Sequence, residues 1–150
     1  MDKQRAQRIT ESYALVAPSV DRIAEHFYAA LFRDHAALRA IFPADMTRQR
    51  QHLATAIAMT ARNADRIAAM EQPLREMGAR HQRYGALPAH YPVVCDLLIA
   101  AIAHVAGPAW NARLEADWRE LLGAVSAAML RGAAEEANII ARELEDTGAR

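Results

Sequence analysis

The chain has 150 residues, a formal net charge of zero and a single cysteine, Cys95. The balanced charge argues against a general affinity for nucleic acid or for an anionic membrane, and the lone thiol excludes an internal disulfide framework and fits a reducing compartment. A chain of this length can bury a core and enclose a small-molecule pocket, so we expect one domain over residues 1–150.

The N-terminal segment MDKQRAQRITESY is polar and has no apolar leader. The longest apolar run, VVCDLLIAAIAHVA, carries Asp96 and His104 and is shorter than a bilayer requires. Both features predict a cytoplasmic protein.

Apolar residues recur at three- and four-residue intervals along nearly the whole chain, among good helix formers such as Ala, Leu, Arg and Glu. Proline and glycine divide this pattern into segments. The predicted helices run from about Lys3 to Ala17, from Ser19 past Leu31, over residues 35–42, from about Asp45 to Ala69, from Pro73 to Gly85, from Pro88 to Gly107 and from Asn111 to Glu145. We therefore expect an all-α domain of six or seven helices.

Three polar residues fall on predicted apolar faces: Tyr28, His81 and Glu135. Each has an ordinary interpretation, because an inward histidine or tyrosine is usually a hydrogen-bonded core residue. Glu136 could also take the inner position in place of Glu135. Together, however, the three suggest an imidazole that holds a metal and a carboxylate that orients the ring.

The segments HFYAALF, AIFP, RQRQHLATAI and GARHQRYGALPAHYPVVCDLLIAAI resemble the bacterial globins. The similarity is strongest to the globin domain of flavohaemoglobins and to the single-domain bacterial haemoglobins. It implies a globin fold in which three helices lie over three others around haem b.

The resemblance also implies roles for individual residues. His81 matches the proximal histidine that binds iron, and Tyr91 and Glu135 match the pair that hydrogen-bonds around it. On the distal side, Tyr28 and Gln49 match the residues that face a bound gas.

Further residues are expected to contact haem by the same resemblance. Leu53 would lie above the iron and Phe42 flat against the macrocycle, with Met77 and Ile57 lining the slot. Arg80 would reach a haem propionate or, as for most exposed arginines, remain in solvent. His52, one turn after Gln49, would bind iron as a sixth ligand or point toward solvent or a propionate, and we favour the second.

The function implied is reversible binding of oxygen and of other diatomic gases, nitric oxide and carbon monoxide, at ferrous haem. Three alternatives stay open. One is a nitric oxide dioxygenase served by a separate reductase, since no dinucleotide-binding unit follows within 150 residues. The others are a gas sensor that acts through a partner and a helical bundle without haem. A homodimer is also compatible with the sequence.

Overall fold

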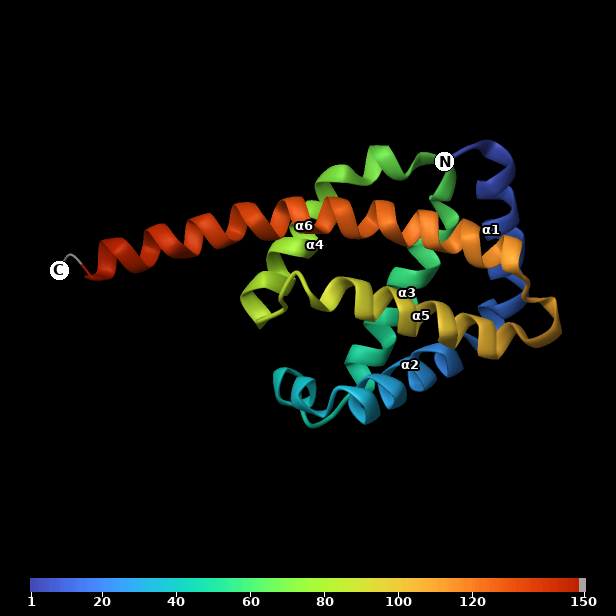
Figure 1. Cartoon of the computed structure of the whole chain (residues 1–150), viewed down its shortest axis with the longest axis horizontal. Helices are drawn as coiled ribbons and strands as arrows, with labels where there is room; N and C mark the ends of the chain where they lie inside the picture. Colours follow the sequence, from blue (N-terminus) through green and yellow to red (C-terminus); the bar gives the residue numbers. More distant parts are fainter. Residues whose placement is uncertain (149–150) are drawn as a thin grey trace.

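The computed structural model describes residues 1–148, and these form α-helices and short 3₁₀-helices without any strand (Figure 1). The six α-helices are α1 (Lys3–Val16), α2 (Val20–Asp34), α3 (Thr47–Arg62), α4 (Glu71–Tyr84), α5 (His90–Ala106) and α6 (Ala112–Gly148). The 3₁₀-helices are η1 (Ala17–Ser19), η2 (Ala36–Ile41), η3 (Ala64–Met70) and η4 (Gly107–Ala109). The predicted all-α class is confirmed.

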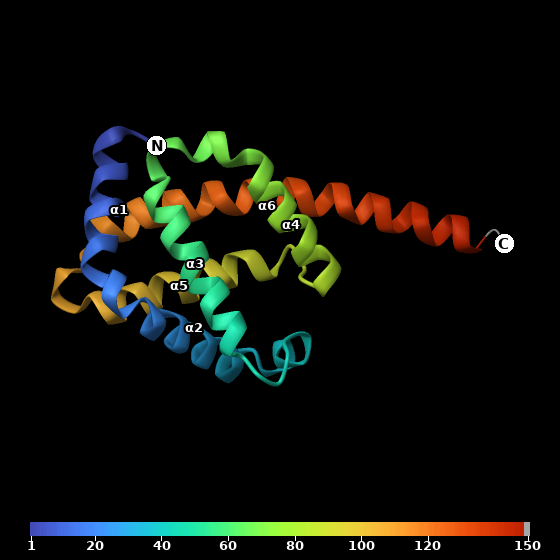
Figure 2. The same cartoon turned by 180° about the vertical axis from the view of Figure 1, so that it is seen from behind.

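The helices lie across one another in two directions (Figures 1 and 2). α2 lies along α5, and α4 packs against the middle of α6. α6 has 37 residues, and its C-terminal turns extend beyond the other helices in both views.

The buried apolar residues form two clusters. The larger joins α1, α2, α3, α5 and the first half of α6 and includes Tyr28, Ile57 and Trp118. The smaller joins α4, the start of α5 and the middle of α6 around Leu74, Tyr91 and Met129. The core is thus divided between two groups of helices.

The α4–α6 contact depends on two glycines. A Cβ atom on Gly78 would overlap the backbone of Met129, and one on Gly132 would overlap the backbone of Arg75. Without side chains at these two positions, the helix backbones approach closely. This contact fixes α4, the helix that carries His81.

α4 ends at a glycine with left-handed backbone. Gly85 has φ = 102°, and the amide of Ala86 donates to the carbonyl of His81 at 3.0 Å. This conformation is costly for other residues and closes the end of a helix. At its other end α4 begins at Glu71, two residues before the predicted start, and Pro73 lies in its first turn, where a missing amide proton costs little.

The prediction of one long helix from about Asp45 to Ala69 is wrong at its C-terminal end. α3 ends at Arg62, and η3 follows with a non-helical residue at Arg66. Asn63 lies at the break, and both its backbone amide and its side-chain amide donate to the carbonyl of Met59, at 3.1 and 2.7 Å. Asparagine favours such local bonds over continued helix.

The apolar segment around α5 is longer than the sequence interpretation allowed. Residues His90–Ala109 are long and apolar enough to cross a membrane by length and composition alone. A mostly buried core helix passes the same test; 22% of this window is buried, and α5 packs against both α2 and α6.

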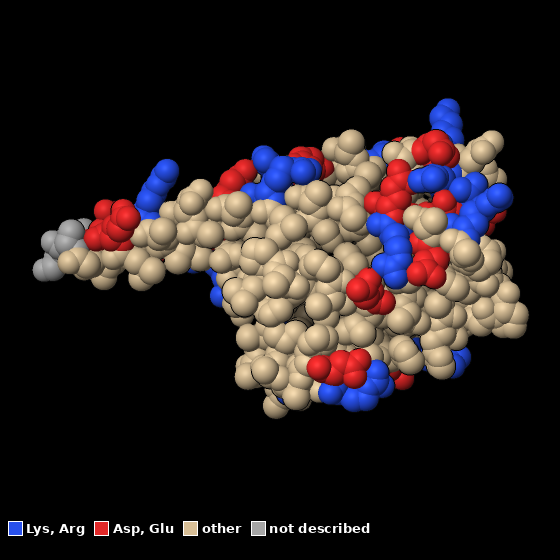
Figure 3. Space-filling view, viewed as in Figure 1, with Lys and Arg blue, Asp and Glu red and all other residues tan. Residues whose placement is uncertain are grey.

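α1 is tied to α6 by charged groups. Asp117 is 1% exposed and accepts two hydrogen bonds from Arg8, at 2.6 and 2.8 Å, while Arg5 lies 3.7 Å away. Figure 3 shows charged side chains gathered over this end of the molecule, whereas the middle of the same face is largely uncharged.

Candidate functional site

Tyr28 and Gln49 form a hydrogen-bonded pair between α2 and α3. The Gln49 amide donates to the Tyr28 hydroxyl oxygen at 3.2 Å. Tyr28 is 7% exposed, and burial raises the pKa of its hydroxyl while the Gln49 bond opposes the rise. The hydroxyl therefore stays protonated near neutral pH, and because it accepts from Gln49 its own proton is free to be donated elsewhere.

Phe42 lies against this pair in a cluster of three aromatic rings. The Phe42 ring meets the Tyr28 ring edge to face at 5.6 Å, and Phe32 lies 5.8 Å from Tyr28 and 5.3 Å from Phe42. Such contacts restrict the orientation of each ring. The cluster fixes the Tyr28 side chain in the corner between α2 and the segment after η2.

Arg39 holds that segment in place. Its guanidinium donates to the carbonyls of Phe42, Pro43 and Ala44 at 2.9 to 3.2 Å, and it lies 5.1 Å above the Phe32 ring. A planar fork with several donors suits this arrangement better than an ammonium group. Arg39 therefore fixes the backbone that carries Phe42.

His81 lies on α4 in a defined tautomer. Its Nδ1 atom is 2.8 Å from the carbonyl oxygen of Met77. A carbonyl only accepts, so Nδ1 carries the ring proton and the lone pair lies on Nε2. A neutral imidazole with its other nitrogen anchored in this way is the form that binds a metal ion.

Glu135 does not have the inward position that was predicted. Its side chain is 59% exposed and pairs with Arg75 at 3.2 Å. Glu136 faces inward instead, with a side chain 13% exposed that pairs with Arg83. Successive residues of an α-helix point about 100° apart, so Glu135 and Glu136 cannot both face inward. The Met77 carbonyl, rather than Glu135, accepts the ring proton of His81.

Among the described residues of the smaller apolar cluster, one buried side-chain oxygen lacks a hydrogen-bond partner. It is the hydroxyl of Tyr91 on α5, whereas Oε1 of Glu136 on α6 is held by the Arg83 ion pair. Buried polar atoms without partners are rare, and they often mark a place where a ligand or water completes the structure. The Tyr91 hydroxyl, in the cluster against which Met77 packs, stays a candidate for such a place.

The other predicted residues divide by location. Phe42, Leu53 and Ile57 belong to the larger cluster with Tyr28, while Met77 and Tyr91 belong to the smaller one. The predicted distal and proximal residues thus fall in different parts of the core. Arg80, His52 and His81 are exposed, so His81 does not have the buried, apolar surroundings that were predicted for it.

The globin family model matches residues 25–129 of this chain. The chain is a globin. The matched range contains the Tyr28–Gln49 pair, the Phe42 segment, His81 and Tyr91. The predicted family and globin fold are confirmed.

Relatives of this globin include flavohaemoproteins. That of Bacillus subtilis is 27% identical over 133 residues, which cover 87% of this chain and 33% of that protein. That of Bacillus thuringiensis is 34% identical over 111 residues, which cover 72% of this chain and 27% of that protein. This chain spans a third or less of their length.

Solved structures of similar shape cover nearly the whole globin. An engineered carbene transferase from Rhodothermus marinus, named provisionally as a nitric oxide dioxygenase, has a TM-score of 0.81 at 26% identity and covers 96% of this chain and 99% of its own. A bacterial globin from Campylobacter jejuni also has a TM-score of 0.81, at 21% identity, and covers 91% of this chain and 99% of its own.

The side chains fit the haem that the globin family binds. His81 presents the lone pair of Nε2, which haem iron requires of an axial ligand. Met77, whose carbonyl accepts the ring proton of His81, packs against the smaller apolar cluster, and the unpartnered Tyr91 hydroxyl belongs to the same cluster. Mainly apolar surroundings with few polar groups are what a cofactor site requires.

Sequence reasoning missed two residues of this site, Phe32 and Arg39. Phe32 follows Tyr28 by four residues, so helical spacing alone could have placed the two rings side by side. Arg39 gave no such signal, because its three acceptors are backbone carbonyls whose direction depends on the turn after η2.

Proposed function

We propose that this globin holds haem b through Nε2 of His81 and binds oxygen reversibly beside Tyr28. The haem would supply the iron that binds a diatomic gas. The observation that supports the proposal best is the direction of the Tyr28–Gln49 hydrogen bond.

Tyr28 has one proton and Gln49 leaves it free. Because the amide of Gln49 donates to the hydroxyl oxygen, the O–H bond of Tyr28 can point away from Gln49. Burial keeps the hydroxyl neutral and excludes water that would compete for it. Tyr28 is therefore a donor oriented in advance for a gas that gains negative charge on binding.

His81 and Met77 act on the opposite side. The carbonyl of Met77 holds the ring proton on Nδ1 and fixes the angle of the imidazole. This bond to a neutral carbonyl makes the imidazole a weaker electron donor than a carboxylate partner would. Such a proximal side suits reversible binding better than bond-breaking chemistry.

The test is the oxygen dissociation rate of Tyr28→Phe. A hydrogen bond to a charged acceptor contributes about 1.5–3 kcal/mol, which corresponds to about a 10- to 100-fold faster release. Stopped-flow displacement of oxygen by carbon monoxide measures the rate. Gln49→Leu is the companion variant, and its smaller expected effect reflects the loss of orientation alone. An unchanged rate in Tyr28→Phe would remove Tyr28 from the gas site.

Nitric oxide dioxygenase is the second candidate function. The similarity to the Rhodothermus marinus protein and to flavohaemoproteins favours it. The activity needs an electron donor, so a separate reductase would act as partner if no reductase domain is joined to this globin. Nitrate formed per haem over many turnovers, with NADH and a reductase present, distinguishes catalysis from simple gas binding.

A further inference from the structure

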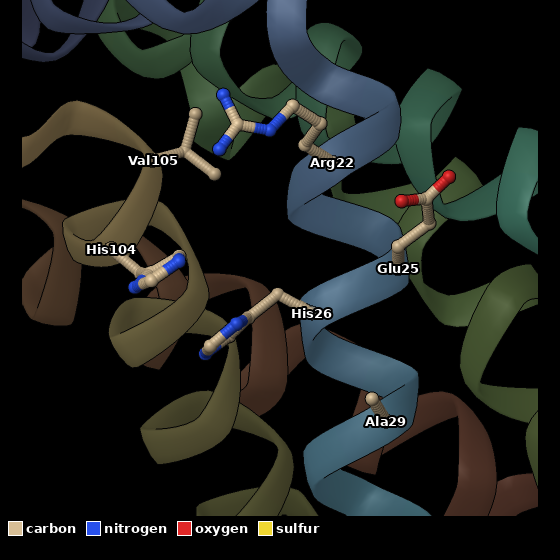
Figure 4. Close-up of a pocket in the computed structure, with 6 residues that line it drawn as sticks. All are labelled: Arg22, Glu25, His26, Ala29, His104 and Val105. Atoms are coloured by element: carbon tan, nitrogen blue, oxygen red, sulfur yellow. The ribbon is translucent and has the colours of Figure 1, made fainter.

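A hollow of about 300 Å³ lies on the surface between α2 and α5, away from the residues that face haem. Arg22, Glu25, His26 and Ala29 line it from α2, and His104 and Val105 line it from α5 (Figure 4). Nothing in the proposed gas chemistry uses these residues.

The imidazoles of His26 and His104 meet face to face in this hollow. Their ring centroids are 4.3 Å apart, and the ring planes differ by 14°. Burial lowers the pKa of His26, and the charges of His104 and Arg33 lower it further. Two stacked rings tolerate one added proton but resist a second, because like charges at this distance repel.

The charges around the two rings are unbalanced. Arg22 precedes His26 by one helical turn, and its guanidinium extends to the same side as the rings (Figure 4). Within residues 1–148, Arg22 belongs to none of the ion pairs. Glu25 is the only carboxylate among the lining residues, and in Figure 4 it is directed away from the rings.

We propose that this hollow binds a tetrahedral oxyanion, either inorganic phosphate or the phosphate group of a small ester, between Arg22, His26 and His104. A guanidinium offers a planar fork that matches two phosphate oxygens. Each imidazole offers one N–H when neutral and two when protonated. A divalent cation fits less well, because Arg22 and Arg33 would repel it and no three His, Cys, Asp or Glu side chains gather around a common point in residues 1–148.

The anion and a proton should bind together. The negative charge of the ligand offsets the repulsion that Arg33 and the second ring exert on a proton added to His26. Affinity should therefore rise as the pH falls toward the range in which histidine titrates. Because the donors come from α2 and α5, the bound anion joins these two helices.

The experiment is calorimetric titration of the haem-loaded, carbon monoxide form at constant ionic strength in a buffer free of phosphate. We expect saturable binding of one phosphate per chain at pH 7.5. Sulfate has the same shape and keeps its charge, so it isolates the protein's own titration. Its affinity should increase about tenfold between pH 7.5 and 6.0, within the limit of one decade per pH unit for one linked proton.

Variants and a second measurement identify the site. Arg22→Gln and the double change His26→Gln with His104→Gln should each weaken phosphate binding at least tenfold. Arg33→Gln, on the same helix but outside the hollow, should weaken it less than threefold. In proton NMR spectra, phosphate should shift the ring resonances of His26 and His104 and leave those of His90 unchanged.

Each outcome decides the proposal. The absence of saturable binding, full binding in Arg22→Gln, or phosphate-induced shifts at His90 alone would overturn it. Acetate that binds as tightly as phosphate would overturn it as well, because a planar monoanion does not use three donor groups. Glycerol phosphate that binds more tightly than inorganic phosphate would identify a phosphate ester as the ligand, and the reverse order would identify free phosphate.

Discussion

Replacing Gly78 by alanine should separate α4 from α6. The added Cβ would overlap the backbone of Met129, which cannot move away as a flexible side chain can. Overpacking of this kind costs about 1–3 kcal/mol and sometimes more, while alanine returns about 1 kcal/mol of helix propensity. Because backbone rather than a side chain must move, we take the overpacking cost at the upper end of its range, about 3 kcal/mol. After the gain in helix propensity, the free energy of unfolding should fall by about 2 kcal/mol.

A loss of this size lowers the melting temperature by about 4–8 °C in a chain of this length. Differential scanning calorimetry of the carbon monoxide form measures it. Gly78 lies three residues before His81, so the displaced helix should also release haem faster to an apoglobin acceptor. Gly132→Ala should have a similar effect, since its Cβ would overlap Arg75 at the same contact.

Gly123→Ala is the matched control. Gly123 is also inside α6, but an added Cβ there meets no atom within 4 Å. This variant should gain up to about 1 kcal/mol from helix propensity alone. If Gly78→Ala melts at or above the temperature of the wild type, the close approach of α4 and α6 is not required, and our account of how His81 is positioned fails.

Three further predictions follow from contacts elsewhere in the structure. Arg39→Met should release haem about tenfold faster, a loss of about 1.4 kcal/mol, because the backbone that carries Phe42 is no longer anchored. Transfer of haem to an apoglobin measures the rate, and a rate equal to that of the wild type would contradict the prediction. Replacement of the exposed Arg33 by methionine is the control. Arg8→Met leaves the buried Asp117 with Arg5 alone and should lower the free energy of unfolding by about 3 kcal/mol, or the melting temperature by about 6–12 °C, as measured by calorimetry. Arg119→Met removes an exposed pair and should change the free energy of unfolding by less than about 1 kcal/mol. Equal losses in the two variants would refute this ranking. Because the pKa of His26 is lowered on folding, the unfolded chain binds more protons, and stability should fall as the pH drops below about 6.5. In phosphate-free buffer, the melting temperature of His26→Gln should therefore decline less between pH 7.5 and 5.5 than that of the wild type. A parallel decline in the two proteins would exclude His26 as a cause.

The helices could be predicted from the sequence because their apolar spacing and their proline and glycine boundaries are local signals. Gly85 ends α4 as expected, for instance, with the positive φ that this residue permits. The end of α3 could not be predicted from periodicity, because the pattern continues through Ile67 while the side chain of Asn63 competes for a backbone carbonyl.

The pairing of side chains across helices was predicted only where a resemblance supplied it. Tyr28 and Gln49 are 21 residues apart and meet because α3 crosses α2. The choice between Glu135 and Glu136 depends on the rotation of α6 about its own axis, which the close contact at Gly132 sets. A difference of one residue on a helix cannot be resolved from sequence when both positions carry the same side chain.

If haem binds where we propose, the two-part core would give it a structural role as well as a chemical one. Tyr28 and Phe42 belong to one apolar cluster, and Tyr91 and Met77, the residue whose carbonyl contacts His81, belong to the other. A flat apolar molecule bound between them would contact both clusters, so its binding free energy would also stabilise the packing of one cluster against the other. In such a globin, haem binding and folding stability are coupled. In chains without haem, the contacts between α4 and the larger apolar cluster should open first.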